Sequence, residues 1–252
     1  MTNFTDHDEV GAAVAVWVDG DLMVNLWGGY ADARRRRRWR EDTLASVFSG
    51  TKGLTSTCVH LLADRWDIDL YAPVAAYWPE FAQNGKQDIT VASVLGHRSG
   101  VIGPRTRLHW NDTTDWDRVC AQLAASEPWW EPNTAQGYHM VSFGFILGEV
   151  VRRVTGRTIG QYLRTEIAEP MGIDVHIGLP SAEHHRCAEM VNKPHIRDVL
   201  ASSQAPGYPT SLDEHPMAGL SIAMCFVPDD ELGSNELTRW RSSEFPGTNG
   251  HV

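Results

Sequence analysis

Ser49 and Lys52 stand three residues apart in the segment Ser49-Gly-Thr-Lys52, and this pair of side chains could carry out nucleophilic catalysis. At the start of a helix, such spacing places the hydroxyl and the amine on the same side. A serine hydroxyl is a weak nucleophile until a neighbour takes its proton, and a lysine can do so only when burial or nearby positive charge lowers its pKa from about 10.4. The motif therefore predicts an acyl-transfer site with Ser49 as nucleophile and a buried Lys52 as its base.

The scarcity of lysine strengthens this interpretation. The chain has three lysines against nineteen arginines, and arginine cannot act as a base because it stays protonated. At a helix N-terminus the backbone N–H of Ser49 could also donate to the oxyanion that forms on attack. The competing interpretation is a capping serine beside a lysine that lies along the surface. A Ser-His-Asp site is not indicated, because the residue two before Ser49 is Val47 and no G-x-S-x-G motif occurs.

The elements that must position these residues can be read from hydrophobic spacing. Residues 14–18 and 22–27 are rich in β-branched and aromatic residues and flank Asp19-Gly20, which predicts a β-hairpin. Apolar residues at helical spacing predict a helix over 54–66, with Lys52 near its first turn. Its expected buried stripe is Leu54, Val59, Leu61, Leu62 and Trp66. Further helices are expected over 89–95, entered through Thr90, over 115–126, over 142–154 and from Thr158 to about 169, with Gly156 as a stop signal.

Composition argues against several classes of partner. The net charge of -10 repels phosphate backbones and anionic lipid, so no nucleic-acid or membrane partner is expected. The basic run at residues 34–38 with Arg40 is interpreted as a solvated loop between strand-like segments. The N-terminus is polar and acidic, unlike a signal peptide, and no apolar run reaches the roughly 18 residues of a spanning helix. A cytoplasmic protein is predicted.

The cysteine and histidine pattern indicates neither a disulfide framework nor a metal site. The four cysteines are far apart, without paired C-x-x-C spacing, and are expected to be free thiols: Cys58, Cys120, Cys187 and Cys225. His184 and His185 with Cys187 lack the second ligand pair of a structural zinc site, which favours a surface loop. No metal and no organic cofactor are expected, because the candidate nucleophile and base are protein groups.

Three segments resemble those of the serine β-lactamase-related and penicillin-binding-protein-like hydrolases. They are Val47-Phe-Ser-Gly-Thr-Lys-Gly-Leu54, Ile89-Thr-Val-Ala-Ser-Val-Leu-Gly-His-Arg-Ser-Gly-Val101 and Gly137-Tyr-His-Met-Val-Ser-Phe-Gly144. The resemblance runs from Val10 to Val252 and is nearest to the class C-like carboxylesterases, also called family VIII esterases. It implies an α+β, β-lactamase/transpeptidase-like fold, with an antiparallel sheet flanked by helices and a mainly helical domain.

The resemblance also implies a third site residue and a substrate preference. Tyr138 matches the family's tyrosine, which shares the proton with the lysine and passes it to the leaving group. Met140 departs from the family's Y-x-N form, because methionine cannot form the amide hydrogen bonds that asparagine gives to a β-lactam side chain. This favours esters. His97 and His139 could be rival acid/base groups, but in the resembling family the first is structural.

The family's third motif, K-T-G or H-x-G on a strand lining the site, is expected beyond the end of this chain. Its N-terminal helix is expected to be absent or shortened. The chain is therefore interpreted as one incomplete β-lactamase-related domain over 1–252 without its C-terminal strands. Within it we expect a hairpin at about 12–28, a mainly helical region at about 50–175 and a loop-rich region over 180–252.

These observations predict a serine hydrolase that acts through an acyl-enzyme, as a carboxylesterase on small esters. Alternatives within the same chemistry are a β-lactamase, a D-amino-acid peptidase or another amide hydrolase, which share the serine and lysine. A non-catalytic remnant that lacks the third motif is the alternative from another class. The expected partner is a small-molecule ester or amide, and exposed strand edges make a homo-oligomer possible.

Overall fold

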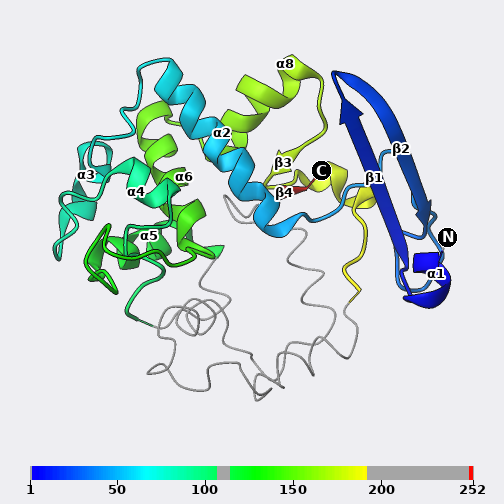
Figure 1. The fold of residues 1–252 in the computed structure, drawn as a ribbon, viewed down its shortest axis with the longest axis horizontal. Helices are drawn as coiled ribbons and strands as arrows, with labels where there is room; N and C mark the ends of the chain where they lie inside the picture. The colour runs from blue at the N-terminus through cyan, green and yellow to red at the C-terminus, as the bar shows by residue number, and fades with distance from the viewer. Residues whose placement is uncertain (1, 107–113, 192–249, 252) are drawn as a thin grey trace.

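The computed structural model describes residues 2–106, 114–191 and 250–251, and it combines a helical body with a β-hairpin that stands beside it (Figure 1). The N-terminal part comprises α1 (Thr2–Asp6), β1 (Gly11–Val18), β2 (Asp21–Gly29), the 3-10 turn η1 (Phe48–Gly50) and α2 (Thr51–Asp64). Next come α3 (Val74–Tyr77), η2 (Pro79–Ala82), α4 (Val91–Leu95), α5 (Trp116–Ala125) and α6 (Ser142–Thr155). The remainder comprises α7 (Ile159–Leu163), the π-helical η4 (Arg164–Ala168), α8 (Glu169–Met171), β3 (His176–Ile177), η5 (Ser181–Arg186) and β4 (Gly250–His251).

The expected hairpin is present as the antiparallel pair of β1 and β2, with Gly11 opposite Gly29 and a bulge between Val16 and Trp17. Asp19 and Gly20 form the turn with φ values of 52° and 90°, the left-handed region that tight hairpin turns require. The short α1 precedes the hairpin, so a helix of five residues stands where an absent or shortened N-terminal helix was expected.

The expected helix after the hairpin is α2, but its buried stripe differs from the prediction at one end. Val59 and Leu62 are buried as expected, and Leu54 and Leu61 pack partly buried against the core. The prediction for Trp66 was wrong, because this side chain is 94% exposed. The helix ends at Asp64 and Trp66 has a φ of 63°, so the helical spacing no longer directs its side chain inward.

The core of the helical body is centred on α6, whose residues from Ser142 to Val151 are all buried. This helix contacts α2, α4, α5 and α7, which together surround it. It ends at Gly156, whose φ of 70° provides the left-handed C-cap that the sequence indicates. Thr158 then forms a capping box with Gln161, which begins α7. The helices expected over 89–95 and 115–126 are present as α4, capped by Thr90, and α5.

Two expected surface segments make specific contacts in the structure. Within the basic run, Arg37 is half-buried, and its guanidinium donates to the backbone carbonyls of Ala31, His185 and Cys187, so the interpretation of the whole run as solvated was wrong at this position. Buried Arg side chains find such carbonyl partners because an unpaired charge is costly. Cys187 is itself buried beside Leu44 and Leu179 rather than lying in a surface loop.

The three described cysteines, Cys58, Cys120 and Cys187, are free and buried, which confirms the expectation for them, and Cys225 lies outside the described residues. Most of the region expected to be rich in loops over 180–252 also lies outside them. At its far end, β4 pairs antiparallel with β3, His251 opposite His176, and its backbone lies against η1 and α2 (Figure 1). Among the helices described, none has the length and apolar character needed to cross a membrane.

Candidate active site

Ser49 occupies the middle of η1, the turn that leads directly into α2. The residue before it, Phe48, has a φ of 45°, a left-handed conformation that is uncommon for a bulky side chain and costs conformational energy. Ser49 itself is exposed. The turn therefore presents the hydroxyl at the surface of the helical body, two residues before α2 begins.

Lys52 lies in the first turn of α2 and connects this helix to the segment before α6. Its Nζ donates to Ser49 Oγ at 3.2 Å and to the backbone carbonyl oxygen of Met140 at 2.7 Å. The Lys52 side chain is half-buried, whereas the sequence predicted a buried one. Two acceptors thus hold the amine next to the hydroxyl, at a distance that permits proton transfer between them.

Tyr138 lies just before α6, and its ring faces the same amine. The ring centroid lies 4.7 Å from Lys52 Nζ, which is within the range of a cation–π contact. The side chain is 41% exposed, so it borders the same surface as Ser49. The three residues that the sequence nominated are therefore brought together from η1, α2 and the segment before α6.

Two histidines lie behind Tyr138. The His139 ring is fully buried: its Nδ1–H donates to the Gly137 carbonyl oxygen at 2.7 Å, which leaves Nε2 to accept from Ser99 Oγ at 2.6 Å. Burial lowers the pKa of His139 to about 4, because the charged form would lose its hydration. This ring is neutral near pH 7 and serves as a hydrogen-bonded part of the core.

His97 packs against the Tyr138 ring, with ring centroids 5.0 Å apart, and also against Phe143 at 5.0 Å. Its Nδ1 accepts the backbone N–H of His139 at 3.1 Å, so its own proton lies on Nε2. Burial first, and the positive charge of Lys52 second, lower the pKa of His97. These contacts give both histidines structural roles, in line with the interpretation from sequence.

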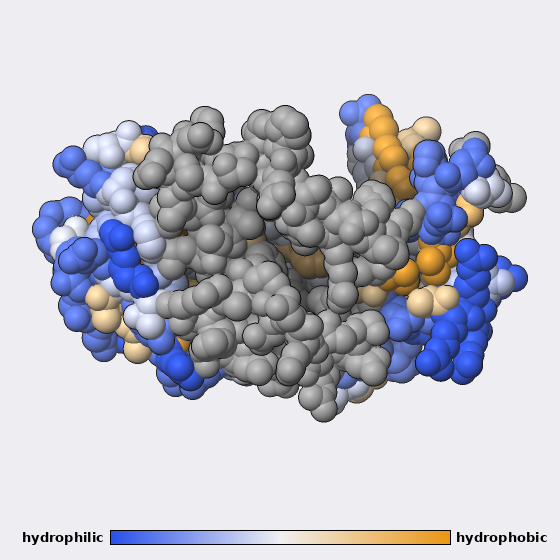
Figure 2. Space-filling model, turned by 90° about the horizontal axis from the view of Figure 1, so that it is seen from below, coloured by the Kyte–Doolittle hydropathy of each residue, from blue (hydrophilic) through white to orange (hydrophobic). Residues whose placement is uncertain are grey.

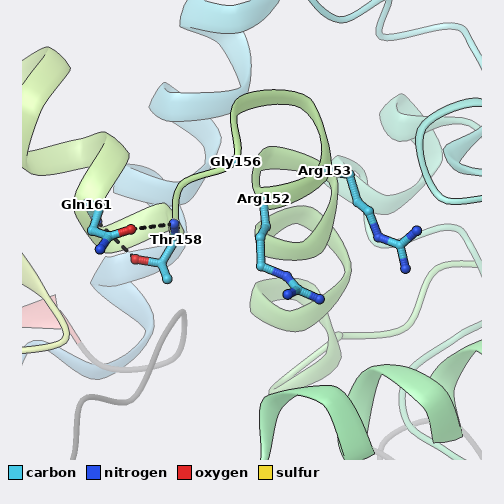
Figure 3. A pocket seen from close by; sticks show the side chains of 5 residues that line it. All are labelled: Arg152, Arg153, Gly156, Thr158 and Gln161. Atoms are coloured by element: carbon cyan, nitrogen blue, oxygen red, sulfur yellow. Dashed lines mark hydrogen bonds between the residues drawn. The ribbon is translucent and has the colours of Figure 1, made fainter.

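A surface depression lies at the C-terminal end of α6 (Figure 3). It is lined by Arg152, Arg153, Gly156, Thr158 and Gln161. Both arginines donate to the buried carboxylate of Glu149, and each also pairs with a second carboxylate, Arg152 with Asp117 and Arg153 with Glu80, so their charges are compensated. No cluster of three or more potential metal ligands occurs among residues 2–106, 114–191 and 250–251.

A hydroxyl, an amine within hydrogen-bond distance of it and a phenol ring against the amine are groups that nucleophilic catalysis by serine could use. The Beta-lactamase family model matches residues 2–229. The chain belongs to the Beta-lactamase family.

Relatives of this Beta-lactamase family member include hydrolases with esterase names. Esterase/beta-lactamase LipL of Mycobacterium tuberculosis is 40% identical over 183 residues, which cover 72% of the chain and 42% of LipL. Esterase EstB of Burkholderia gladioli is 29% identical over 197 residues, covering 71% of the chain and 49% of EstB. The chain thus spans just under half the length of these curated relatives.

Solved structures confirm the expected α+β, β-lactamase/transpeptidase-like fold. The crystal structure of a family VIII carboxylesterase has a TM-score of 0.77 and 44% identity, covering 99% of the chain and 63% of that protein. A penicillin-binding protein homologue from Caulobacter crescentus also has a TM-score of 0.77, at 34% identity, covering 100% of the chain and 63% of that protein. The predicted resemblance to the family is confirmed.

Sequence reasoning missed two parts of the site. The Met140 carbonyl oxygen that accepts from Lys52 is a backbone atom, so no residue type signals it. The bond between the His139 N–H and the His97 ring joins positions 42 residues apart. Both histidines stand inside the segments that carry the family resemblance, and this was the available signal for the second.

Proposed function

We propose that this chain carries the nucleophile and base of a serine hydrolase that acts on small esters through an acyl-enzyme. The carrying observation is the 3.2 Å contact between Lys52 Nζ and Ser49 Oγ, with the amine anchored on the Met140 carbonyl oxygen. Lys52 takes the proton of Ser49 as Oγ attacks the ester carbonyl carbon. Charge develops on the carbonyl oxygen, and the backbone N–H of Ser49 is the proposed donor to it.

Collapse of this intermediate breaks the bond to the alcohol oxygen and leaves the acyl group on Ser49. The proton that Lys52 took passes to the departing alcohol, and Tyr138, whose ring lies against the amine, assists this transfer. Water then attacks the acyl-enzyme, loses a proton to the same base and releases the carboxylic acid. Ser49 recovers its proton, so hydroxyl, amine and phenol all return to their starting states.

Two observations support esters as the substrate. Met140 stands where the family's Y-x-N form has asparagine, and it contributes its backbone carbonyl oxygen to Lys52 rather than a side-chain amide to a substrate. Both curated relatives described above carry esterase names. The proposed partner is therefore a small-molecule ester or amide, bound without metal or organic cofactor.

The alternative within the family is β-lactam hydrolysis, which the double name of LipL favours. Hydrolysis of p-nitrophenyl butyrate and of nitrocefin by the chain distinguishes the two, with Ser49→Ala as the control. We expect ester turnover that the substitution abolishes, and ester kcat/KM above that for nitrocefin. Turnover of nitrocefin alone would overturn the ester assignment, and ester turnover that survives Ser49→Ala would overturn the site.

A further inference from the structure

The residues on either side of Tyr138 are both hydrogen-bonded to one residue, His97. His97 accepts the His139 backbone N–H through Nδ1 at 3.1 Å, while its own carbonyl oxygen accepts the Gly137 N–H at 3.0 Å. Since backbone hydrogen bonds on either side of a residue restrict its φ and ψ, these two contacts restrict where the Tyr138 side chain can lie.

The His97 ring also contacts the site itself. It packs against the Tyr138 ring, with ring centroids 5.0 Å apart, and Lys52 Nζ lies 4.7 Å from the centroid of the same Tyr138 ring. Phe143 of α6 supports the same imidazole at 5.0 Å. The order of contacts runs from α6 through His97 and Tyr138 to the amine of Lys52.

The backbone of His97 is itself adapted to this task. Its φ of 58° lies in the left-handed region, where histidine is less strained than bulky or β-branched residues but is still uncommon. This conformation follows the end of α4 and lets both the carbonyl oxygen and the ring point to the 137–139 segment. Residues in such uncommon conformations persist where the surrounding contacts hold them there, and they cluster at functional sites.

We propose that His97 is a positioning residue, which holds the Tyr138 ring against Lys52 through its Nδ1 acceptor and its ring face. The proposal rests on the function proposed above for Ser49, Lys52 and Tyr138. His97 takes no proton in the reaction. Its effect is on how often Tyr138 occupies the orientation from which it assists proton transfer to the leaving group.

Two substitutions separate this role from a general effect on folding. His97→Gly removes the ring but accommodates the positive φ without strain. His97→Asn also tolerates that conformation and places its Oδ1 on Cγ, where the Nδ1 of histidine is attached, so it restores the acceptor. His60→Ala is the matched control, because His60 is exposed on α2 and its ring is hydrogen-bonded to the Ser56 carbonyl oxygen of the same helix.

The first readout is hydrolysis of an alkyl ester such as ethyl butyrate, whose departing alkoxide needs a proton, separated into kcat and KM. We expect His97→Gly to lower kcat about tenfold to a hundredfold with little change in KM, the size of effect that misplacement of a catalytic group produces. His97→Asn should recover most of it, and His60→Ala should match the wild-type chain. Equal rates in His97→Gly and wild type, or an Asn variant as slow as the Gly variant, would overturn the proposal.

The second readout does not depend on activity. Hydrogen exchange at the His139 amide should be slow in the wild-type chain and in His97→Asn, and at least about tenfold faster in His97→Gly, because only the last lacks an acceptor for this N–H. If the wild-type chain does not hydrolyse the ester, the proposed function fails, and this exchange pattern still decides whether His97 holds the segment. Unchanged exchange in His97→Gly would show that it does not.

Discussion

At the scale of single residues, the account depends on an amine that can accept a proton. Lys52 lies 3.2 Å from Ser49 Oγ and is anchored by a carbonyl oxygen on the far side. Arginine at this position would keep the positive charge and much of the length but could not act as a base. The identity of this one side chain therefore decides whether the hydroxyl beside it is activated.

Lys52→Arg should lower the rate at which Ser49 Oγ attacks an electrophile by about 10²–10⁴-fold, the usual contribution of general-base catalysis. The rate of adduct formation with a fluorophosphonate measures this effect, and circular dichroism of the same sample checks folding. Lys52→Arg that reacts as fast as the wild-type chain would show that Lys52 is not the base.

The lowered pKa of His139 predicts how the stability of the chain depends on pH. Its folded-state pKa of about 4 lies below the ordinary histidine value of 6.5, so between these values the unfolded chain binds a proton that the folded chain does not. Its contribution to the free energy of unfolding is thus complete above pH 6.5 and is lost as the pH falls toward 4. The loss amounts to about 3 kcal/mol.

Urea unfolding at intervals from pH 7 to pH 4 tests this dependence. Other groups also titrate in this range, so the informative quantity is the difference between the wild-type chain and His139→Gln, whose side chain does not titrate. Between pH 7 and pH 4, the free energy of unfolding of the wild-type chain should fall by about 3 kcal/mol more than that of His139→Gln. Parallel curves would mean that the His139 pKa is not depressed.

At the scale of elements, the absence of a side chain at Gly160 allows α7 and β3 to approach closely. A Cβ on Gly160 of α7 would overlap the backbone carbonyl oxygen of Ile177 in β3. A Cβ on Gly53 of α2 would meet nothing within 4 Å. These two helical glycines therefore form a matched pair with opposite expected responses to alanine.

Gly160→Ala should destabilise the chain by about 3 kcal/mol, the upper range of overpacking, because backbone rather than a flexible side chain must move. Gly53→Ala should stabilise it by roughly 0.5–1 kcal/mol, since alanine loses less conformational entropy in a helix. Chemical denaturation of both variants measures these changes. A neutral Gly160→Ala would contradict the close contact between α7 and β3.

Elements with local signals were predictable from sequence, and contacts to distant backbone atoms were not. Gly156 predicts the end of α6 and Thr158 predicts the start of α7, because glycine favours the C-cap and threonine the N-cap of a helix. Trp66 was misplaced because helical spacing continues in the sequence after the helix has ended. Lys86 is fully buried and donates to the carbonyl oxygens of Gln83, Ala124 and Ser126, which no pattern of residue types records.

The same distinction applies to the candidate site. Ser49 and Lys52 share one turn, so their spacing alone places them together. Tyr138 lies 86 residues after Lys52 in the sequence, so their spacing does not predict that they are in contact. Only the resemblance to a family predicts it. The placement of Tyr138 depends on the packing of α2 against α6, which is a property of the tertiary structure.

At the scale of the whole molecule, the hairpin presents apolar side chains to solvent. The exposed large hydrophobic residues of the hairpin are Val14, Val16, Trp17, Val18, Leu22, Met23, Leu26 and Trp27. Figure 2 shows hydrophobic residues gathered on the side of the molecule where the hairpin lies in Figure 1. Apolar surface of this kind drives association, because its burial removes it from water.

We therefore expect the chain to self-associate at micromolar concentration. Leu26→Lys on β2 should weaken association about tenfold or more, since burying a leucine contributes about 1.5–3 kcal/mol. Trp66→Lys is the control, because this 94% exposed aromatic residue lies outside the hairpin. Sedimentation equilibrium measures both. A monomeric wild-type chain, or equal weakening by the two substitutions, would contradict this role of the hairpin.

The central claim is that Ser49 is an activated nucleophile, and intact-mass spectrometry after incubation with a fluorophosphonate tests it most directly. The account predicts one covalent adduct per chain, formed in minutes on the wild-type protein and absent from Ser49→Ala. A folded wild-type chain that gains no adduct, or a Ser49→Ala variant that gains the same one, would contradict it.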